Sequence, residues 1–207
     1  MPAELITTDG IFALDGGEWE VTNNIWLVGD DRQVLIIDAA HDADRINAAV
    51  NGRRVKGIVL THGHNDHINA AIALQDIVDA PIHLHPADQM LWEAVYPGSK
   101  PDRRLVPGEV LIAGGEALGV MHTPGHSPGC CCFHAPQSGL LFSGDTLFCG
   151  GPGATGRSYS DFPTIIDSIR EQLLELPPET IVHTGHGDST TIGAEAPHLQ
   201  EWIERGH

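Results

Sequence analysis

Short apolar runs separated by polar and glycine-rich stretches predict a chain that alternates strands with helices. Strands are expected at 25–29 and 33–38, which flank the acidic turn Asp30-Asp31, and at 56–61. Further short strands are expected at 82–85, 109–113, 118–122, 130–134, 139–143 and 180–183. The loops that follow such strands are where catalytic groups usually collect, so these loops are searched first for chemistry.

The clearest helix is predicted to begin at the capping residue Asp161 and to end before Pro177-Pro178. Its apolar positions recur at helical spacing on one face: Phe162, Ile166, Ile169, Leu173 and Leu176. Other helices are expected at 42–51, 68–78, 86–95 and 194–205. Strand-rich halves that are each followed by helices predict an α+β fold with two sheets packed face to face and helices outside. Without a low-complexity linker, residues 1–207 are expected to form a single domain.

The net charge of the chain limits the kinds of molecule that it is expected to bind. The 207 residues include 28 Asp and Glu against 11 Lys and Arg, which gives a formal net charge of −17. Such a chain repels phosphate, so binding to nucleic acid or to an anionic membrane is not expected. No 18-residue apolar stretch and no secretory signal are found, which predicts a cytoplasmic protein. The densest positive charge lies in the predicted loop 96–108.

Histidine and cysteine differ in what they indicate. Three of the four cysteines are adjacent, at 130–132, and neighbouring side chains on a strand point to opposite faces, so a disulfide framework is not expected. These residues are interpreted as small side chains of a buried strand. The 13 histidines outnumber Lys and Arg together, which is a first indication of metal chemistry.

The strongest local motif is the stretch 61–67, Thr-His-Gly-His-Asn-Asp-His, between a predicted strand and a predicted helix. In an extended loop His62 and His64 point the same way and can reach one ion, whereas Asp66 and His67 can face a second position. Imidazole and carboxylate ligands together suit zinc, iron or manganese. The motif therefore predicts a metal site that needs further ligands from elsewhere in the chain.

Those further ligands are found after other predicted strands. His126 lies in a Pro- and Gly-rich turn at 123–129, Asp145 follows the strand at 139–143, and His186 follows the strand at 180–183. Each of the three is flanked by glycine, which lets the backbone pass close to a site.

These motifs in this order resemble the metallo-β-lactamase superfamily and, within it, the glyoxalase II-like hydrolases. The resemblance covers nearly the whole chain and implies a four-layer αββα sandwich. It implies one metal ion held by His62, His64 and His126, and a second held by Asp66, His67 and His186. It also implies that Asp145 bridges the two ions and that Asp38 supports the site by hydrogen bonding.

The resemblance implies a hydrolase in which a hydroxide between two divalent ions attacks the substrate carbonyl. Zinc is the expected metal, with iron or manganese as alternatives, and Asp66 is assigned a catalytic role besides its role as a ligand. The bridging carboxylate Asp145 is absent from the β-lactam-hydrolysing members, which favours hydrolysis of a small acyl-thiol ester. The thiol carrier is left open, because the chain ends about twenty residues after His186, too soon for the helical domain that binds glutathione.

Two alternatives belong to the same superfamily. One is a persulfide dioxygenase with a single Fe(II) held by His62, His126 and Asp145. The other is a lactonase. A nuclease is disfavoured by the net charge of −17, and a binding module without catalysis is the least favoured interpretation.

Weaker candidates lie outside the ligand motifs. Arg157 is expected either to bind a substrate carboxylate or to pair with Asp161 and brace its loop, and Tyr159 is a weaker pocket candidate. Trp19 is expected either over the pocket or as a packed anchor of its loop. His83 and His85 repeat the His-x-His spacing without a nearby carboxylate, so a structural role is expected for them.

Overall fold

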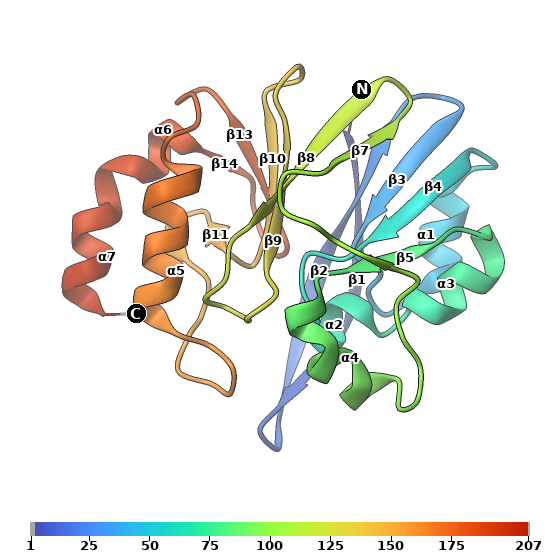
Figure 1. The fold of residues 1–207 in the computed structure, drawn as a ribbon, viewed down its shortest axis with the longest axis horizontal. Helices are drawn as coiled ribbons and strands as arrows, with labels where there is room; N and C mark the ends of the chain where they lie inside the picture. The colour runs from blue at the N-terminus through green and yellow to red at the C-terminus, as the bar shows by residue number, and fades with distance from the viewer. Residues whose placement is uncertain (1–2, 207) are drawn as a thin grey trace.

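Residues 3–206 are described by a computed structural model, in which two six-stranded sheets pack face to face with helices on both outer surfaces (Figure 1). The predicted α+β sandwich with four αββα layers is confirmed. No helix within residues 3–206 combines the length and the apolar character that crossing a bilayer requires.

The first sheet is mixed, and its strands follow one another in chain order. It contains β1 (Ala3–Leu14), β2 (Gly17–Gly29), β3 (Gln33–Ile37), β4 (Arg54–Val59), β5 (Ile82–Leu84) and β6 (Arg103–Arg104). Strands β1 to β3 pair antiparallel, whereas β3 to β6 pair parallel. The parallel strands bring the segments that follow β3, β4 and β5 to one edge of the sheet.

The second sheet has the order β14-β13-β10-β9-β8-β7. Its strands are β7 (Val110–Ala113), β8 (Glu116–His122), β9 (Cys131–Ala135), β10 (Leu140–Gly144), β13 (Ile181–Thr184) and β14 (Thr190–Thr191). A separate two-stranded ribbon pairs β11 (Leu147–Phe148) with β12 (Gly151–Pro152). Because β10 and β13 are parallel, the loops after both strands also meet at one edge.

The helices cover the two outer surfaces, one group for each sheet (Figure 1). The first sheet is covered by α1 (Ala43–Val50), α2 (Asn65–Ile68), α3 (Ala71–Val78), η1 (Pro86–Asp88) and α4 (Gln89–Val95). The second is covered by α5 (Phe162–Ser168), the π-helical turn η2 (Ile169–Leu173), α6 (Ile192–Glu195), η3 (Ala196–His198) and α7 (Leu199–Arg205).

Burial on both faces explains the nearly continuous apolar runs of the central strands. In β3, Val34 and Ile36 pack against the helices of the first half, whereas Leu35 and Ile37 pack between the sheets. In β10, Phe142 faces the first sheet and Leu141 faces α5 and α7. A strand buried on both faces has no polar side to interrupt its apolar sequence.

Three predictions of local structure need correction. No strand was predicted before residue 25, yet β1 and β2 form a long hairpin with twelve paired positions. The helix predicted at 68–78 is two helices, interrupted at Asn69–Ala70. There the Ala39 N–H bonds to the His67 carbonyl and the Ala70 N–H bonds to the Ala39 carbonyl, so backbone pairing with the segment after β3 replaces helical bonds. The terminal helix predicted at 194–205 is also divided, into α6, η3 and α7, with Pro197 in η3.

The adjacent cysteines lie where they were predicted. Cys131 and Cys132 are in β9 and Cys130 precedes it, and all three thiols are buried and free. Burial raises the pKa of the Cys131 thiol well above its ordinary value and that of Cys132 to about 11. These thiols are therefore neutral packing groups of the strand.

Candidate metal centre

The seven predicted ligands come together at the edge where the two sheets meet. They follow β4, precede β9, and follow β10 and β13, so both halves of the chain contribute. They form three overlapping groups whose ligand atoms lie within 4.8 Å of one another: His62, His64 and His126; His62, His67 and Asp145; and Asp66, His67 and His186. All except His186 are buried.

The first group is a triangle of histidine nitrogens. His64 Nδ1 lies 3.0 Å from His62 Nε2 and 2.9 Å from His126 Nε2. Two nitrogens bound to one tetrahedral zinc ion at 2.0–2.1 Å are separated by about 3.3 Å. The triangle therefore has nearly the dimensions that a single divalent ion requires.

The second group adds carboxylate oxygens to two further rings. His67 Nε2 lies 3.1 Å from His186 Nε2, and Asp66 Oδ2 lies 3.5 Å and 3.4 Å from these two nitrogens. Asp145 faces both groups, because its Oδ2 lies 3.6 Å from His126 Nε2 and 3.5 Å from His186 Nε2. The other oxygen of Asp145, Oδ1, is buried and accepts no hydrogen bond. A carboxylate oxygen left without a donor in this position fits a ligand shared by two ions.

Outer hydrogen bonds fix which ring nitrogen faces the centre. His126 Nδ1 lies 2.8 Å from the Ala154 carbonyl and His186 Nδ1 lies 2.8 Å from the Thr22 carbonyl. A carbonyl only accepts, so each Nδ1 must carry the proton and donate it. In the neutral ring Nε2 then turns a lone pair toward the centre, as a metal ligand must.

Asp38 lies within hydrogen-bond distance of the centre, as its predicted supporting role would require. It lies just after β3 with a positive φ of 64°, a conformation that Asp tolerates better than most residues. Its Oδ1 accepts from the Thr61 N–H at 2.7 Å, and its Oδ2 lies 2.9 Å from His67 Nδ1. This contact orients the His67 ring with Nε2 inward.

Protonation differs between the rings of the centre. Burial opposes it, but Asp145 and Asp66 hold the pKa of His67 well above its ordinary value, and Asp145 raises the pKa of His186 to about 10, so these two rings carry a proton that a bound cation would displace. Burial lowers the pKa of His64 to about 3, and the neighbouring His126 lowers it further. Burial would raise the pKa of Asp66, but His67 and the hydrogen bonds from His186 and Asn23 outweigh it and hold this pKa at about 2. An ionised Asp66 is suited to binding a cation rather than to carrying a proton.

No sequence motif pointed to Asn23, which is fully buried beside Asp66. Its Nδ2 donates to Asp66 Oδ2 at 3.0 Å, and its Oδ1 lies 2.9 Å from His41 Nε2. Asn69 in turn contacts the ring of His41 at Nδ1, at 2.9 Å. A chain of polar groups thus holds the Asp66 carboxylate from the side of β2.

A cavity of about 390 Å³ opens over the centre. Besides five of the seven predicted ligands, it is lined by Phe12, Trp19, Val21, Phe148, Ala154 and Arg157. The first three come from the hairpin of β1 and β2, and the last two from the loop after β12. The walls above the polar centre are therefore mainly apolar and aromatic, with Arg157 as the one arginine or lysine among the residues that line the cavity.

Arg157 does not pair with Asp161, which was one of the two alternatives predicted for it. The Asp161 carboxylate accepts from the N–H and the hydroxyl of Thr164, and no Arg157–Asp161 ion pair is present in residues 3–206. The guanidinium instead lies 3.7 Å from the ring centroid of Trp19 and 5.6 Å from that of Phe12. Arg157 therefore braces its loop against the hairpin and also lines the cavity.

Tyr159 and the second His-x-His pair lie away from the centre. Tyr159 is 54% exposed and is not among the residues that line the cavity. His85 stacks on His122, with ring centroids 4.1 Å apart, and neither His83 nor His85 belongs to a candidate metal group within residues 3–206. The structural role expected for this pair is consistent with that placement.

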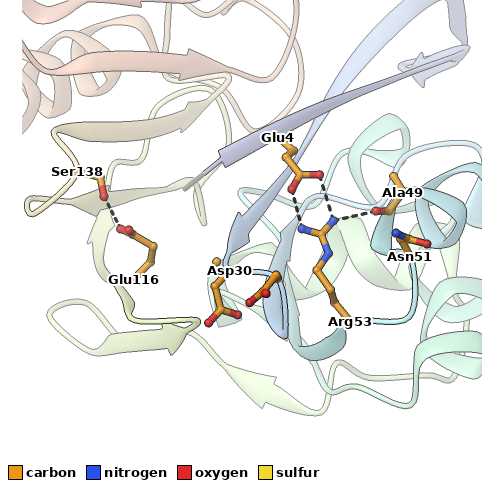
Figure 2. Close-up of a pocket in the computed structure, with 9 residues that line it drawn as sticks. Glu4, Asp30, Ala49, Asn51, Arg53, Glu116 and Ser138 are labelled. Atoms are coloured by element: carbon orange, nitrogen blue, oxygen red, sulfur yellow. Dashed lines mark hydrogen bonds and ion pairs between the residues drawn. The ribbon is translucent and has the colours of Figure 1, made fainter. Parts of the chain in front are cut away.

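A larger hollow, of about 800 Å³, lies at the other ends of the strands (Figure 2). In it the Arg53 guanidinium bonds both oxygens of Glu4 and the carbonyl of Ala49, and Glu116 accepts from Ser138. None of the seven predicted ligands lines this hollow. Size alone would thus have pointed away from the residues that carry metal chemistry.

Comparison with known families agrees with the geometry. The profile described as the metallo-beta-lactamase superfamily matches residues 19–186. The chain belongs to this superfamily. Membership and the His and Asp cluster support a metal-dependent hydrolase with a site for divalent metal that acts on small molecules.

Similar proteins extend over most of the chain. It is 36% identical over 187 residues to the probable metallo-hydrolase YqgX of Bacillus subtilis, covering 84% of this chain and 88% of that one. It is 34% identical over 186 residues to the hydroxyacylglutathione hydrolase GloC of Haemophilus influenzae, covering 83% and 87%.

Two solved structures are similar in fold and sequence. TTHA1623 in a di-iron-bound form has a TM-score of 0.77 at 35% identity, covering 85% of this chain and 93% of that one. The BLEG-1 B3 metallo-beta-lactamase has a TM-score of 0.78 at 31% identity, covering 93% and 98%.

Proposed function

We propose that the protein is a binuclear metal-dependent hydrolase that cleaves a small acyl-thiol ester. The observation that carries the proposal is the position of Asp145, whose two oxygens face the ligand nitrogens of both groups. His62, His64 and His126 would hold one ion, and Asp66, His67 and His186 the other, with Asp145 shared. The similarity to GloC, which is named a hydroxyacylglutathione hydrolase, supports the thioester class.

When bound, two divalent ions would acidify a water molecule and polarise the substrate carbonyl, as expected of such pairs. The residues of the chain contribute orientation: Asp38, Ala154 and Thr22 hold the rings of His67, His126 and His186 with Nε2 inward. Phe12, Trp19 and Phe148 line the cavity beside the centre with apolar surface, which makes the surroundings of the reacting bond less polar than water. Zinc is the metal we favour, and the di-iron form of TTHA1623 supports iron as the alternative.

Arg157 is the group we propose for binding an anionic part of the substrate. Its guanidinium lines the cavity and makes no ion pair within residues 3–206, so its hydrogen-bond donors are available to a carboxylate. The stack on Trp19 restricts the side chain and lowers the entropy lost on binding. Tyr159 is left out of the proposal because it does not line the cavity.

Elemental analysis of freshly purified protein together with a substrate panel tests this function. The panel contains acyl thioesters of glutathione and of other small thiols, a lactone, a β-lactam and a persulfide with oxygen consumption recorded. We expect two metal ions per chain and the highest kcat/KM on a thioester. A single iron with oxygen consumption would contradict the proposal, and so would hydrolysis restricted to the β-lactam, the activity for which BLEG-1 is named.

A further inference from the structure

A buried carboxylate that the proposed chemistry does not use lies behind the first histidine group. Asp88 sits where η1 meets α4, and its side chain is fully buried. Its Oδ2 accepts from the Gly63 N–H at 2.8 Å and from the Ser127 hydroxyl at 2.6 Å. Its Oδ1 accepts from the Gly129 N–H at 2.6 Å. Both oxygens are therefore occupied by short bonds.

The three donors belong to the two loops that carry the first histidine group. Gly63 lies between His62 and His64, in the loop after β4 of the first sheet, and Ser127 directly follows His126, in the loop before β9 of the second sheet. One carboxylate thus joins the loops that must be held at a fixed separation for three nitrogens to meet one ion.

Glycines at positions 63 and 129 let Asp88 lie close to the two loops. A Cβ atom at Gly129 would lie 2.6 Å from Asp88 Cγ, and one at Gly63 would lie 3.0 Å from Asp88 Cβ and 2.8 Å from Leu91 Cβ. Real Cβ atoms are essentially never found closer than 3.0 Å, so a side chain at Gly129 would push Asp88 away from the loop, and one at Gly63 would displace Leu91 and crowd Asp88.

The charge on Asp88 has no cationic partner in residues 3–206, because all three donors are neutral. Burying a carboxylate without a cationic partner costs free energy. The three donors can all be satisfied only by a side chain that has a hydrogen-bond acceptor at both terminal positions, Oδ1 and Oδ2. An amide at this position would turn NH₂ toward one of the donors. The arrangement is therefore specific to a carboxylate, whose negative charge also favours a cation among the neighbouring histidines.

We propose that Asp88 is a positioning residue for the first metal site: it fixes the His62–His64 loop against the His126 loop and so sets the affinity of that site for a divalent ion. The inference rests on the metal-binding part of the proposed function and not on the thioester substrate. Supporting residues of this kind typically change metal affinity by about 10- to 100-fold when they are replaced.

The test is titration of the metal-free protein with Zn²⁺ against a chromophoric chelator, in the wild type and in Asp88→Asn. We expect the wild type to bind two ions, and the variant to bind one of them about 10- to 100-fold more weakly and the other nearly unchanged. Asp102→Asn is the matched control, because Asp102 also accepts a backbone N–H, from Ile82, and lies outside the ligand loops. Its two affinities should equal those of the wild type.

Unchanged affinities in Asp88→Asn would overturn the inference, as would an equal loss at both sites, which would mean a general loss of structure. If Asp88→Asn does not fold, Ser127→Ala decides, since it removes one of the three bonds and should weaken the same single ion by a smaller factor. A wild type that binds no Zn²⁺ would overturn the metal centre itself, whereas two tight sites with no thioesterase activity would overturn only the proposed substrate.

Discussion

The position of Asp145 depends on two glycines. Gly144 has a φ of 49°, and a Cβ atom there would lie 2.6 Å from Thr61 Cβ. A Cβ atom at Gly185 would lie 2.2 Å from Asp145 Oδ1. Glycine next to each strand end was noted in the sequence, and the structure supplies the physical reason: the backbone passes too close to the centre for any side chain.

Replacing Asp145 with alanine removes the one carboxylate that faces both ligand groups. We expect Asp145→Ala to lose bound metal and to lower kcat by about 100-fold or more. The reason is that bound metal ions stabilise the charge of the transition state by several kcal/mol. Elemental analysis and thioester turnover measure the two effects. Asp42→Ala, which removes the cap of α1, serves as control and should retain both. Full activity in Asp145→Ala would refute the bridging assignment.

Replacing Arg157 with glutamine removes the cation of the cavity without touching a ligand. For a thioester that bears a carboxylate, KM should rise by about 10-fold or more while kcat changes little, because a hydrogen bond between charged groups contributes about 1.5–3 kcal/mol. Steady-state kinetics measure this split. Arg170→Gln removes an exposed arginine paired with Asp167 and should leave KM unchanged. An unaltered KM in Arg157→Gln would show that Arg157 only braces its loop.

Helices and strands were predictable from the sequence where burial alone determines them. They were not predictable where they depend on pairing with a segment that is distant in the chain. The two-sided burial of β3 and β10 gives continuous apolar runs that the sequence shows directly. β1 contains Thr7, Thr8, Asp9 and Gly10 in its middle, and its extended form depends on pairing with β2. Asp88 and Asn23 gave no signal, because their partners are backbone groups and side chains far away in the chain.

The loop before His126 packs tightly against α5. Gly125 has a φ of 138°, and a Cβ atom there would lie 2.3 Å from the backbone nitrogen of Ile165. Gly125→Ala should therefore lower the free energy of unfolding by about 2–4 kcal/mol through strain and overlap, and should weaken metal binding at His126. Urea unfolding of the metal-free protein measures the first effect.

The control for that substitution is Gly139→Ala. Gly139 also has a positive φ, of 65°, but nothing lies within 4 Å of the position of its Cβ atom. Its cost should be only the conformational strain, about 1–2 kcal/mol. Equal losses in the two variants would mean that contact between the loop and α5 does not matter.

At the scale of the whole molecule, two half-buried histidines outside the centre tie stability to pH. Burial lowers the pKa of His183, which stacks on Trp26 with ring centroids 4.0 Å apart, to about 4. Burial, and then His122, lower the pKa of His85 to about 4. The unfolded chain takes up these protons near pH 6.5. The stability they contribute is thus complete above about pH 6.5 and is lost as pH falls toward 4.

His183→Phe keeps an aromatic ring against Trp26 and removes the titration. The difference in unfolding free energy between pH 7 and pH 5 should therefore be smaller in this variant than in the wild type. Urea unfolding of the metal-free protein at the two pH values measures it. His198→Phe, at an exposed position, should leave the difference unchanged. The same pH dependence in His183→Phe and the wild type would contradict the assignment.

The order of the ligands along the chain has a consequence for the molecule as a whole. Four of them, at positions 62–67, stand on the first sheet, and the other three, at 126, 145 and 186, stand on the second. On the proposed binuclear assignment, each sheet by itself offers an incomplete set of ligands, and neither half of the polypeptide would hold a pair of ions alone. Metal binding would consequently depend on the interface between the two sheets. It would become possible only after the two halves of the chain have packed together.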